Sequence, residues 1–216
     1  MKSALIVWGG WDGHEPRQVS EILAAQLRGK GFAVEVSDKL ETLEDSEKLK
    51  RLDLVVMEWT MGQIRQEQLK PLLEAVRSGV GFAGAHGGAG DSFRNETEYQ
   101  FMVGGQWVAH PGNIVRYGVE ITDRKDPVMA GLDDFEIESE QYYMHVDPSN
   151  QVLCVTTFSG EHGGADWIKG CRMPVAWKRR YGQGRVFYSS LGHVAKDFQV
   201  PEVLTIITRG MMWAAR

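Results

Sequence analysis

Residues 80–93 read VGFAGAHGGAGDSF, an apolar run that gives way to a glycine-rich segment around one histidine. The run at 80–85 is typical of a strand buried on both faces, as the strands of parallel sheets are. A strand that turns directly into a helix needs a strained residue with small neighbours, and the turn projects its central side chain into a crevice. His86 occupies that position, so this segment predicts a strand, a sharp turn and a functional side chain.

Strands and helices alternate through the first half of the chain. Three further apolar runs predict strands, and two apolar stripes at helical spacing predict helices that end before glycines. Alternating elements need crossover connections, which favour a mostly parallel sheet. The strands are predicted at 4–8, 32–36 and 54–58, and the helices at 16–27 and 69–76.

The second half of the chain is less regular. Runs at 114–121 and 152–156 predict strands, and 174–178 with 185–189 predict a hairpin around the turn at 181–184. We expect these to be later strands of the same sheet, some of them antiparallel, followed by a helix from Pro201. A chain of 216 residues without a linker is expected to form one α/β domain over 1–216.

Composition excludes several classes of partner. The net charge is −5 and the only basic cluster is at 178–180, so nothing resembles a nucleic-acid footprint. The apolar start of the chain is too short for a signal sequence or a membrane span, and we expect a cytoplasmic protein. Cys154 and Cys171 match no metal pattern and are expected to be reduced.

Unusual side chains follow the predicted strands. In an open parallel sheet, ligands bind at the carboxyl ends of the strands, where loops converge. Tryptophans at such positions can stack on the apolar face of a sugar. The residues at the ends of the first, third and fourth strands are Trp11, His14, Trp59, His86, Asp91 and Arg94.

Histidines are concentrated in loops rich in glycine or acidic residues. Imidazole can transfer a proton near neutral pH or ligate a metal. Neither cysteine is near the turn at His86 and no GxSxG motif exists, so a Cys- or Ser-dependent hydrolase is disfavoured. No HExxH motif occurs, so a zinc-like ion would need ligands from distant loops. The histidines in such loops are His14, His86, His110, His145 and His193.

The segment 138–145, ESEQYYMH, poses a geometric problem. If it is extended, Glu140 and Tyr142 face one side and His145 faces the other. Glu140 and His145 can therefore reach one site only if the chain bends between them.

Seven ordered motifs over nearly the whole chain resemble the trehalose-utilisation (ThuA-like) family. That resemblance implies a flavodoxin-like three-layer sandwich with helices on both faces of the sheet, similar to class I glutamine amidotransferases. His86 stands in the region of the amidotransferase cysteine, so amidotransferase activity is not implied. The family is associated with disaccharide breakdown, often beside oxidoreductases that make 3-keto sugars. The motifs include GGWDGHEP at 9–16, AHGGAGDSFR at 85–94, GGQWVAHPG at 104–112 and EQYYMHVDP at 140–148.

We therefore expect an enzyme that acts on a sugar or keto-sugar by acid/base chemistry, as a hydrolase, isomerase or lyase. His86 is predicted as acid or base with Glu140 as its partner, and His110 with Asp91 as orienting groups. The sequence assigns no cofactor with certainty and leaves a divalent metal such as zinc open. Two alternatives are a carbohydrate-binding module without chemistry and a metal-dependent hydrolase with a zinc-like ion on His14, His86 and His110. The expected partner is a small carbohydrate, with no nucleic acid or membrane, and the sequence does not choose between monomer and homo-oligomer. The predicted sugar contacts are Trp11, His14, Trp59, Arg94, Tyr142, His145 and His193.

Overall fold

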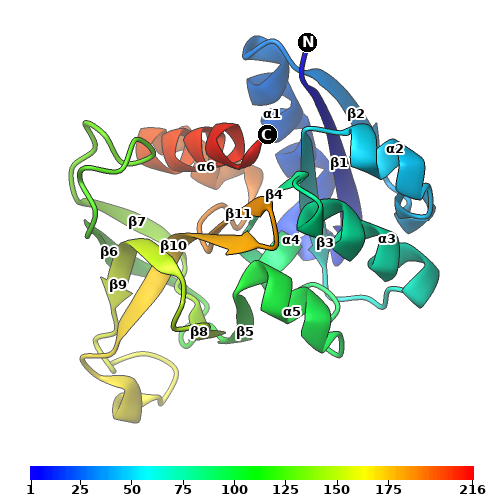
Figure 1. The fold of residues 1–216 in the computed structure, drawn as a ribbon. Coiled ribbons are helices and arrows are strands. Elements are labelled where there is room, and N and C mark those ends of the chain that lie inside the picture. Colours follow the sequence, from blue (N-terminus) through cyan, green and yellow to red (C-terminus); the bar gives the residue numbers. More distant parts are fainter.

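Five parallel strands form the first half of one nine-stranded sheet in the computed structural model, which describes residues 1–216. Their spatial order is β2-β1-β3-β4-β11, and each neighbouring pair is parallel (Figure 1). The strands are β1 (Ser3–Gly10), β2 (Ala33–Ser37), β3 (Leu54–Thr60), β4 (Gly81–Ala85) and β11 (Gly184–Ser189).

Four antiparallel strands extend the sheet beyond β11 in the order β10-β9-β6-β7. A separate two-stranded antiparallel sheet pairs β5 with β8. The extension contains β6 (Ile114–Ile121), β7 (Phe135–Glu140), β9 (Gln151–Thr157) and β10 (Arg172–Tyr181), and the small sheet contains β5 (Gly105–Ala109) and β8 (Tyr143–Val146).

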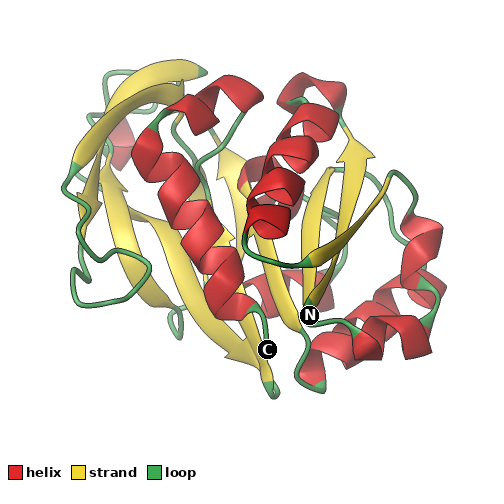
Figure 2. Ribbon diagram, turned by 90° about the horizontal axis from the view of Figure 1, so that it is seen from above, coloured by secondary structure: helices red, strands yellow, loops and turns green.

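Helices cover both faces of the sheet. Helices α1 and α6 lie side by side on one face, with α6 ending near the C-terminus (Figure 2). Helices α2, α3 and α5 belong to the core on the other face, and the short α4 follows β4 directly. The helices are α1 (Pro16–Gly29), α2 (Ser46–Arg51), α3 (Gln66–Arg77), α4 (His86–Gly90), α5 (Thr97–Val103) and α6 (Pro201–Ala214).

The buried strands supply alternate side chains to two cores. In β1, Ala4 and Ile6 join the core under α1 and α6, whereas Leu5 and Val7 join the core under α2 and α3. All four are buried because successive side chains of a strand point to opposite faces. This two-sided burial explains why the strand reads as a continuous apolar run rather than an alternating one.

The predicted fold class, an α/β sandwich with a large central sheet between helices, is confirmed. The hairpin is longer than predicted, and its second strand also pairs in parallel with β4. Five of the helices and strands were not predicted: α2, α5, β5, β7 and β8. Their apolar periodicity is short and interrupted, so tertiary packing rather than local pattern forms them.

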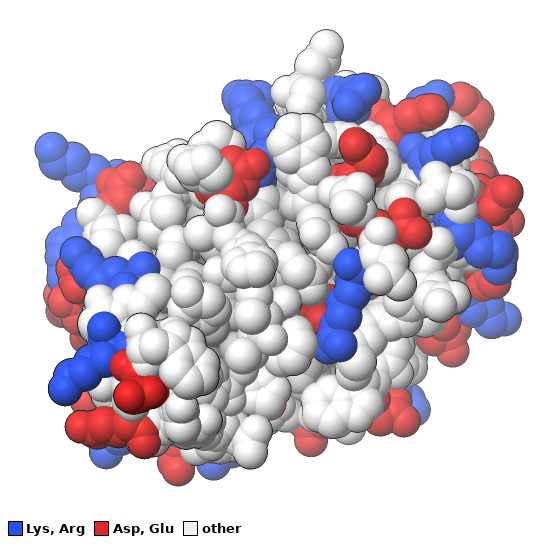
Figure 3. Space-filling view, turned by 90° about the horizontal axis from the view of Figure 1, so that it is seen from below, with Lys and Arg blue, Asp and Glu red and all other residues white.

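The basic run at 178–180 does not form a surface patch. Lys178 is buried and paired with Asp126, and Arg179 is paired with Asp147. Figure 3 shows one face of the molecule, where uncharged atoms cover the centre and charges of both signs lie mostly around the rim. Both cysteines are free thiols, and no helix is long and apolar enough to cross a bilayer.

Gly210 brings α6 close to the sheet, and this contact can be tested. A Cβ at Gly210 would overlap the fully buried ring of Phe187 in β11, whereas a Cβ at Gly29 in α1 would meet nothing within 4 Å. We expect Gly210→Ala to lower the free energy of unfolding by about 1–3 kcal/mol through overpacking. Gly29→Ala should raise it by up to about 1 kcal/mol, because alanine favours helix. Urea unfolding measures both, and equal shifts of the two variants would contradict this packing.

Candidate functional site

Four adjacent parallel strands bring their carboxyl ends to the same edge of the sheet. Gly10 of β1 lies opposite Thr60 of β3, and Ala85 of β4 lies opposite Ser189 of β11. The loops that follow these ends therefore start close together, although they are far apart in sequence. They carry His14 after β1, His86 after β4 and His193 after β11.

The turn at His86 is the strained strand-to-helix turn that the sequence predicts. His86 has a φ of 47°, a left-handed conformation that is uncommon for a residue with a side chain. A Cβ at Gly87 would overlap the His14 ring, and one at Gly88 would overlap the Glu58 carboxyl. The glycines therefore let neighbouring strand ends approach the turn.

Two hydrogen bonds from the end of β11 hold this turn in place. The Tyr188 hydroxyl donates to the His86 carbonyl at 2.9 Å. The His86 Nδ1–H donates to the Ser190 carbonyl at 2.8 Å. These bonds fix both the backbone and the ring of His86, and they direct its Nε2 atom away from β11.

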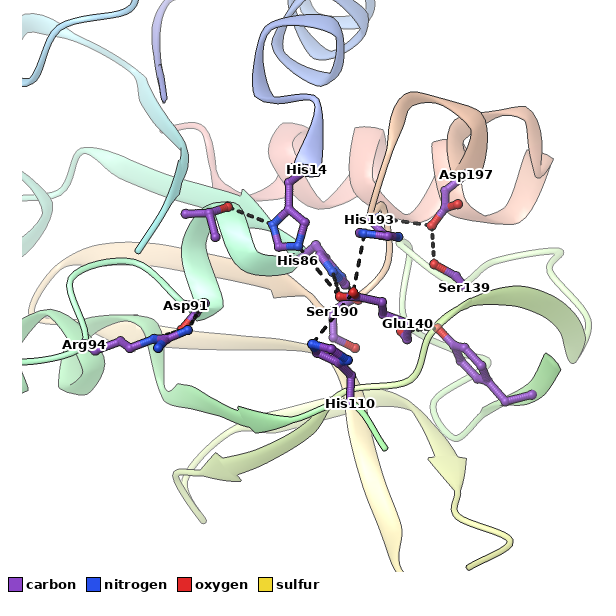
Figure 4. A network of polar contacts seen from close by, with 12 residues as sticks. His14, His86, Asp91, Arg94, His110, Ser139, Glu140, Ser190, His193 and Asp197 are labelled. Carbon is purple, nitrogen blue, oxygen red and sulfur yellow. Dashed lines mark hydrogen bonds and ion pairs between the residues drawn. The ribbon is translucent and has the colours of Figure 1, made fainter. Parts of the chain in front are cut away.

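Four imidazoles converge on the carboxylate of Glu140, which is 6% exposed (Figure 4). The Nε2 atom of His86 lies 3.0 Å from Oε2, and that of His14 lies 3.7 Å from the same oxygen. The Nε2 atoms of His193 and His110 lie 3.5 Å and 3.8 Å from Oε1. The structure thus brings together His14, His86 and His110, the three imidazoles that the sequence grouped, and adds His193.

Glu140 and His110 come from the antiparallel half of the sheet. Glu140 ends β7 opposite Ile114, which starts β6 only four residues after His110. The Tyr117 hydroxyl donates to the Glu140 carbonyl at 3.2 Å. The next residue, Gln141, donates to the Thr156 hydroxyl. The strand end is therefore anchored on both sides of the carboxylate.

Burial sets the protonation of the cluster. It lowers the pKa of His86 to about 3, and it also lowers the pKa of His193. Burial raises the pKa of Glu140, but contacts with His14 and His86 oppose it and bring that pKa below its ordinary value. His86 is therefore neutral and Glu140 ionised at neutral pH.

Further strain and tethers surround the cluster. Glu15 and Met61 also have positive φ values, of 48° and 59°, directly after His14 and after β3. The Glu15 carboxylate accepts a hydrogen bond from the backbone of Ala195, joining the loops that carry His14 and His193. Strained backbone of this kind persists where the surrounding structure enforces it, often at functional sites.

A pocket of about 150 Å³ opens beside the cluster. This volume is below the range of about 300–1,000 Å³ that encloses drug-sized ligands, so it suits one end of a larger molecule. Arg94 borders it with a bidentate hydrogen bond to Asp91 and lies 4.7 Å from the Trp107 ring. The lining consists of Trp11, His14, Thr60, Met61, Asp91, Arg94, Trp107, His110 and Tyr142.

Three predicted sugar contacts do not line the pocket. Trp59 packs against the glycines at Gly9 and Gly62. His193 belongs to the cluster around Glu140. His145 is exposed on β8, in the separate two-stranded sheet, where it is paired with Gln106.

Trp107 and Thr60 are pocket residues that the predicted site lacked. Trp107 lies on the short strand β5, which the sequence did not reveal. Thr60 ends β3 and its hydroxyl lies 2.9 Å from His14 Nδ1. The position of Thr60 at a strand end was the signal from which the sequence could have predicted it as a site residue.

Four side chains could hold a metal ion. His14, His86, His193 and Glu140 each offer a ligand atom, and these atoms all lie within 4.8 Å of one another. His110, one of the three predicted metal ligands, is not in this group and borders the pocket instead. The fold and site together define an α/β sandwich with a buried imidazole–carboxylate centre at the carboxyl edge of its parallel strands.

The chain belongs to the trehalose-utilisation family, because the model of that family, ThuA, matches residues 3–214. A ThuA-like protein of Parabacteroides merdae has the same fold, with a TM-score of 0.78 at 20% identity over 99% of this chain and 89% of that one. A ThuA-like protein of Bacteroides uniformis has a TM-score of 0.78 at 16% identity, over 98% and 89% of the two chains. A cytoplasmic protein of Salmonella typhimurium has a TM-score of 0.70 at 11% identity, over 99% and 100%. The curated proteins contain no match.

Glu58 lies beneath the turn, and burial raises its pKa well above the ordinary value, although the hydrogen bond from Ala85 N–H opposes this. A raised pKa favours the protonated folded state, so stability falls as pH rises above the ordinary carboxyl pKa of about 4.3. The neutral variant Glu58→Gln should not lose stability in this way. We therefore expect its free energy of unfolding, relative to that of the wild type, to be higher at pH 8 than at pH 5. Urea unfolding at both pH values measures the difference. A difference independent of pH would show that Glu58 is not protonated in the fold.

Proposed function

We propose that this protein is an enzyme that acts on a sugar or keto-sugar, such as a disaccharide or glycoside derivative, at the pocket beside Glu140. The observation that carries the proposal is the convergence of four imidazoles on one buried carboxylate next to an aromatic-lined pocket. Membership of the trehalose-utilisation family supports a sugar derivative as the substrate class. The cytoplasmic Salmonella relative supports a cytoplasmic location.

The pocket offers an aromatic face and polar groups to one end of a sugar. Trp11 is 48% exposed and stands edge-on to the His14 ring, so its free face can pack against the C–H face of a sugar ring. The Arg94 guanidinium, held by Asp91, can donate hydrogen bonds to hydroxyl or carbonyl oxygens. An apolar plate with a few fixed polar groups is the usual composition of a small-molecule site.

His110 is the imidazole best placed for proton transfer to a substrate. It borders the pocket, its side chain is 29% exposed, and its ring stacks on Tyr142. His86 is only 2% exposed and both of its ring nitrogens face protein atoms. The proposal therefore gives the acid/base role to His110 and makes His86 part of the centre behind it.

A carbonyl group acidifies the neighbouring C–H bond of a keto-sugar. Removal of that proton by His110 leaves an enolate, whose charge is carried by the carbonyl oxygen. The enolate then takes a proton back on carbon, or it expels a leaving group from the next carbon while His110 returns the proton to that group. Isomerisation and elimination thus share the same first step, for which one positioned base contributes about 10²–10⁴-fold in rate.

The acid/base role of His110 predicts a change in turnover. His110→Gln keeps the size and polarity of the side chain but removes the titratable group. We expect kcat on 3-keto derivatives of trehalose and other disaccharides to fall by about 10²–10⁴-fold with little change in KM. Steady-state kinetics measures both constants. If wild-type protein turns over none of these substrates, the enzyme proposal fails; calorimetric binding without turnover would then identify a carbohydrate-binding module.

Stacking on Trp11 predicts an effect on binding. Trp11→Ala removes an exposed pocket wall, so KM should rise several-fold while kcat changes less. Trp167→Ala is the matched control, because Trp167 is 79% exposed and lies outside the pocket. Equal kinetic effects of the two substitutions would contradict the stacking role.

A further inference from the structure

The contact between His86 and Glu140 joins a ring nitrogen to a buried carboxylate. The His86 Nδ1 atom faces the Ser190 carbonyl, which can only accept, so Nδ1 carries a hydrogen and donates it. The Nε2 atom faces the Glu140 Oε2 atom, 3.0 Å away. An imidazole that donates from Nδ1 can bind a cation through Nε2, and a carboxylate oxygen can bind the same cation.

Two further imidazoles face the same carboxylate. The Nε2 atoms of His14 and His193 lie 3.7 Å and 3.5 Å from Glu140. A proton bridges only two atoms, whereas a metal ion at the centre binds all four side chains together. The ring centroids of His14, His86 and His193 lie 4.8–5.1 Å apart, so the three imidazoles surround one small volume.

The separations match a known coordination geometry. Zinc bonds imidazole nitrogen at about 2.0–2.1 Å, which places neighbouring ligands of a tetrahedron about 3.3–3.4 Å apart. The nitrogen–oxygen distances to Glu140 are 3.0, 3.5 and 3.7 Å for His86, His193 and His14. They bracket the tetrahedral edge, and the four ligand atoms, which all lie within 4.8 Å of one another, would need to close by up to about 1.4 Å to complete the coordination.

Groups around the cluster orient its members as partners of metal ligands do. The Ser190 carbonyl fixes the His86 tautomer, and the Thr60 hydroxyl lies 2.9 Å from His14 Nδ1. Asp197 accepts from the His193 backbone N–H and from the Ser139 hydroxyl. Ser139 precedes Glu140, so Asp197 ties together two of the segments that carry the cluster (Figure 4).

From this geometry we propose that His14, His86, His193 and Glu140 form a binding site for one divalent cation of the zinc class. Three imidazoles select such transition metals over magnesium or calcium, which prefer oxygen ligands. His14 also lines the pocket, so a substrate oxygen entering there would approach the ion from the His14 side. This role of the ion toward a substrate rests on the proposed function. In that reaction the ion would stabilise negative charge on the carbonyl oxygen of the substrate.

Metal binding can be measured without any substrate. Tag-free protein, stripped with a chelator and dialysed, is titrated with Zn²⁺ by calorimetry and with Co²⁺ by visible absorption. We expect one equivalent to bind with a rise in melting temperature, and the Co²⁺ spectrum to show tetrahedral or five-coordinate cobalt. Failure of the folded protein to bind any stoichiometric Zn²⁺, Co²⁺ or Mn²⁺ would overturn the site.

Variants locate the ion. His193→Ala and His14→Ala should each weaken Zn²⁺ binding more than the about 10–100-fold that loss of an outer partner costs. His145→Ala is the matched control and should stay within twofold, because its exposed imidazole lies outside the cluster. Circular dichroism and urea unfolding confirm that each variant is folded. Unchanged affinity in folded His193→Ala and His14→Ala, or an equal loss in His145→Ala, would refute the assignment.

Protein that binds one ion but turns over no sugar retains this inference and loses the proposed function. Full turnover by protein that binds no metal would overturn this inference and retain the proposed function.

Discussion

The parallel pairing of β4 with β3 on one side and β11 on the other is the constraint on which the site depends. It sets the carboxyl ends of adjacent strands level, so that the loops leaving them begin within reach of one another. His86 leaves β4 in a left-handed turn, and the end of β11 receives that turn through the hydrogen bonds of Tyr188 and Ser190. Without this pairing, the imidazoles would belong to unrelated loops.

Burial and charge are balanced around one carboxylate. Glu140 is nearly inaccessible, yet its environment favours the ionised form, while burial keeps His86 neutral. A buried carboxylate is costly unless hydrogen bonds or a positive charge compensate it. This requirement connects the fold to the chemistry, because His14 belongs to the cluster around Glu140 and also lines the pocket.

Much of this arrangement was readable in the sequence, and the failures have physical causes. The turn at His86 was predictable because a strained turn between a buried strand and a helix requires small neighbours, and these are encoded locally. Glu140 and Tyr142 both contact His86, whereas His145 lies on β8 outside the pocket. Trp59, a predicted sugar contact, does not line the pocket, because a strand end fixes position but not the direction in which a large side chain packs.

The sequence by itself determined the five parallel strands, the long helices α1, α3 and α6 and the polar residues at the strand ends, because apolar periodicity and glycine turns are properties of neighbouring residues. Only the tertiary structure decided that His193 joins His14, His86 and Glu140 in one cluster, and that His110 borders the pocket. These residues lie on strands or after them, and the order of those strands in the sheet is set by long-range pairing and by the packing of both cores. No local sequence pattern determines that order, so the complete imidazole–carboxylate cluster can be identified only in the folded structure.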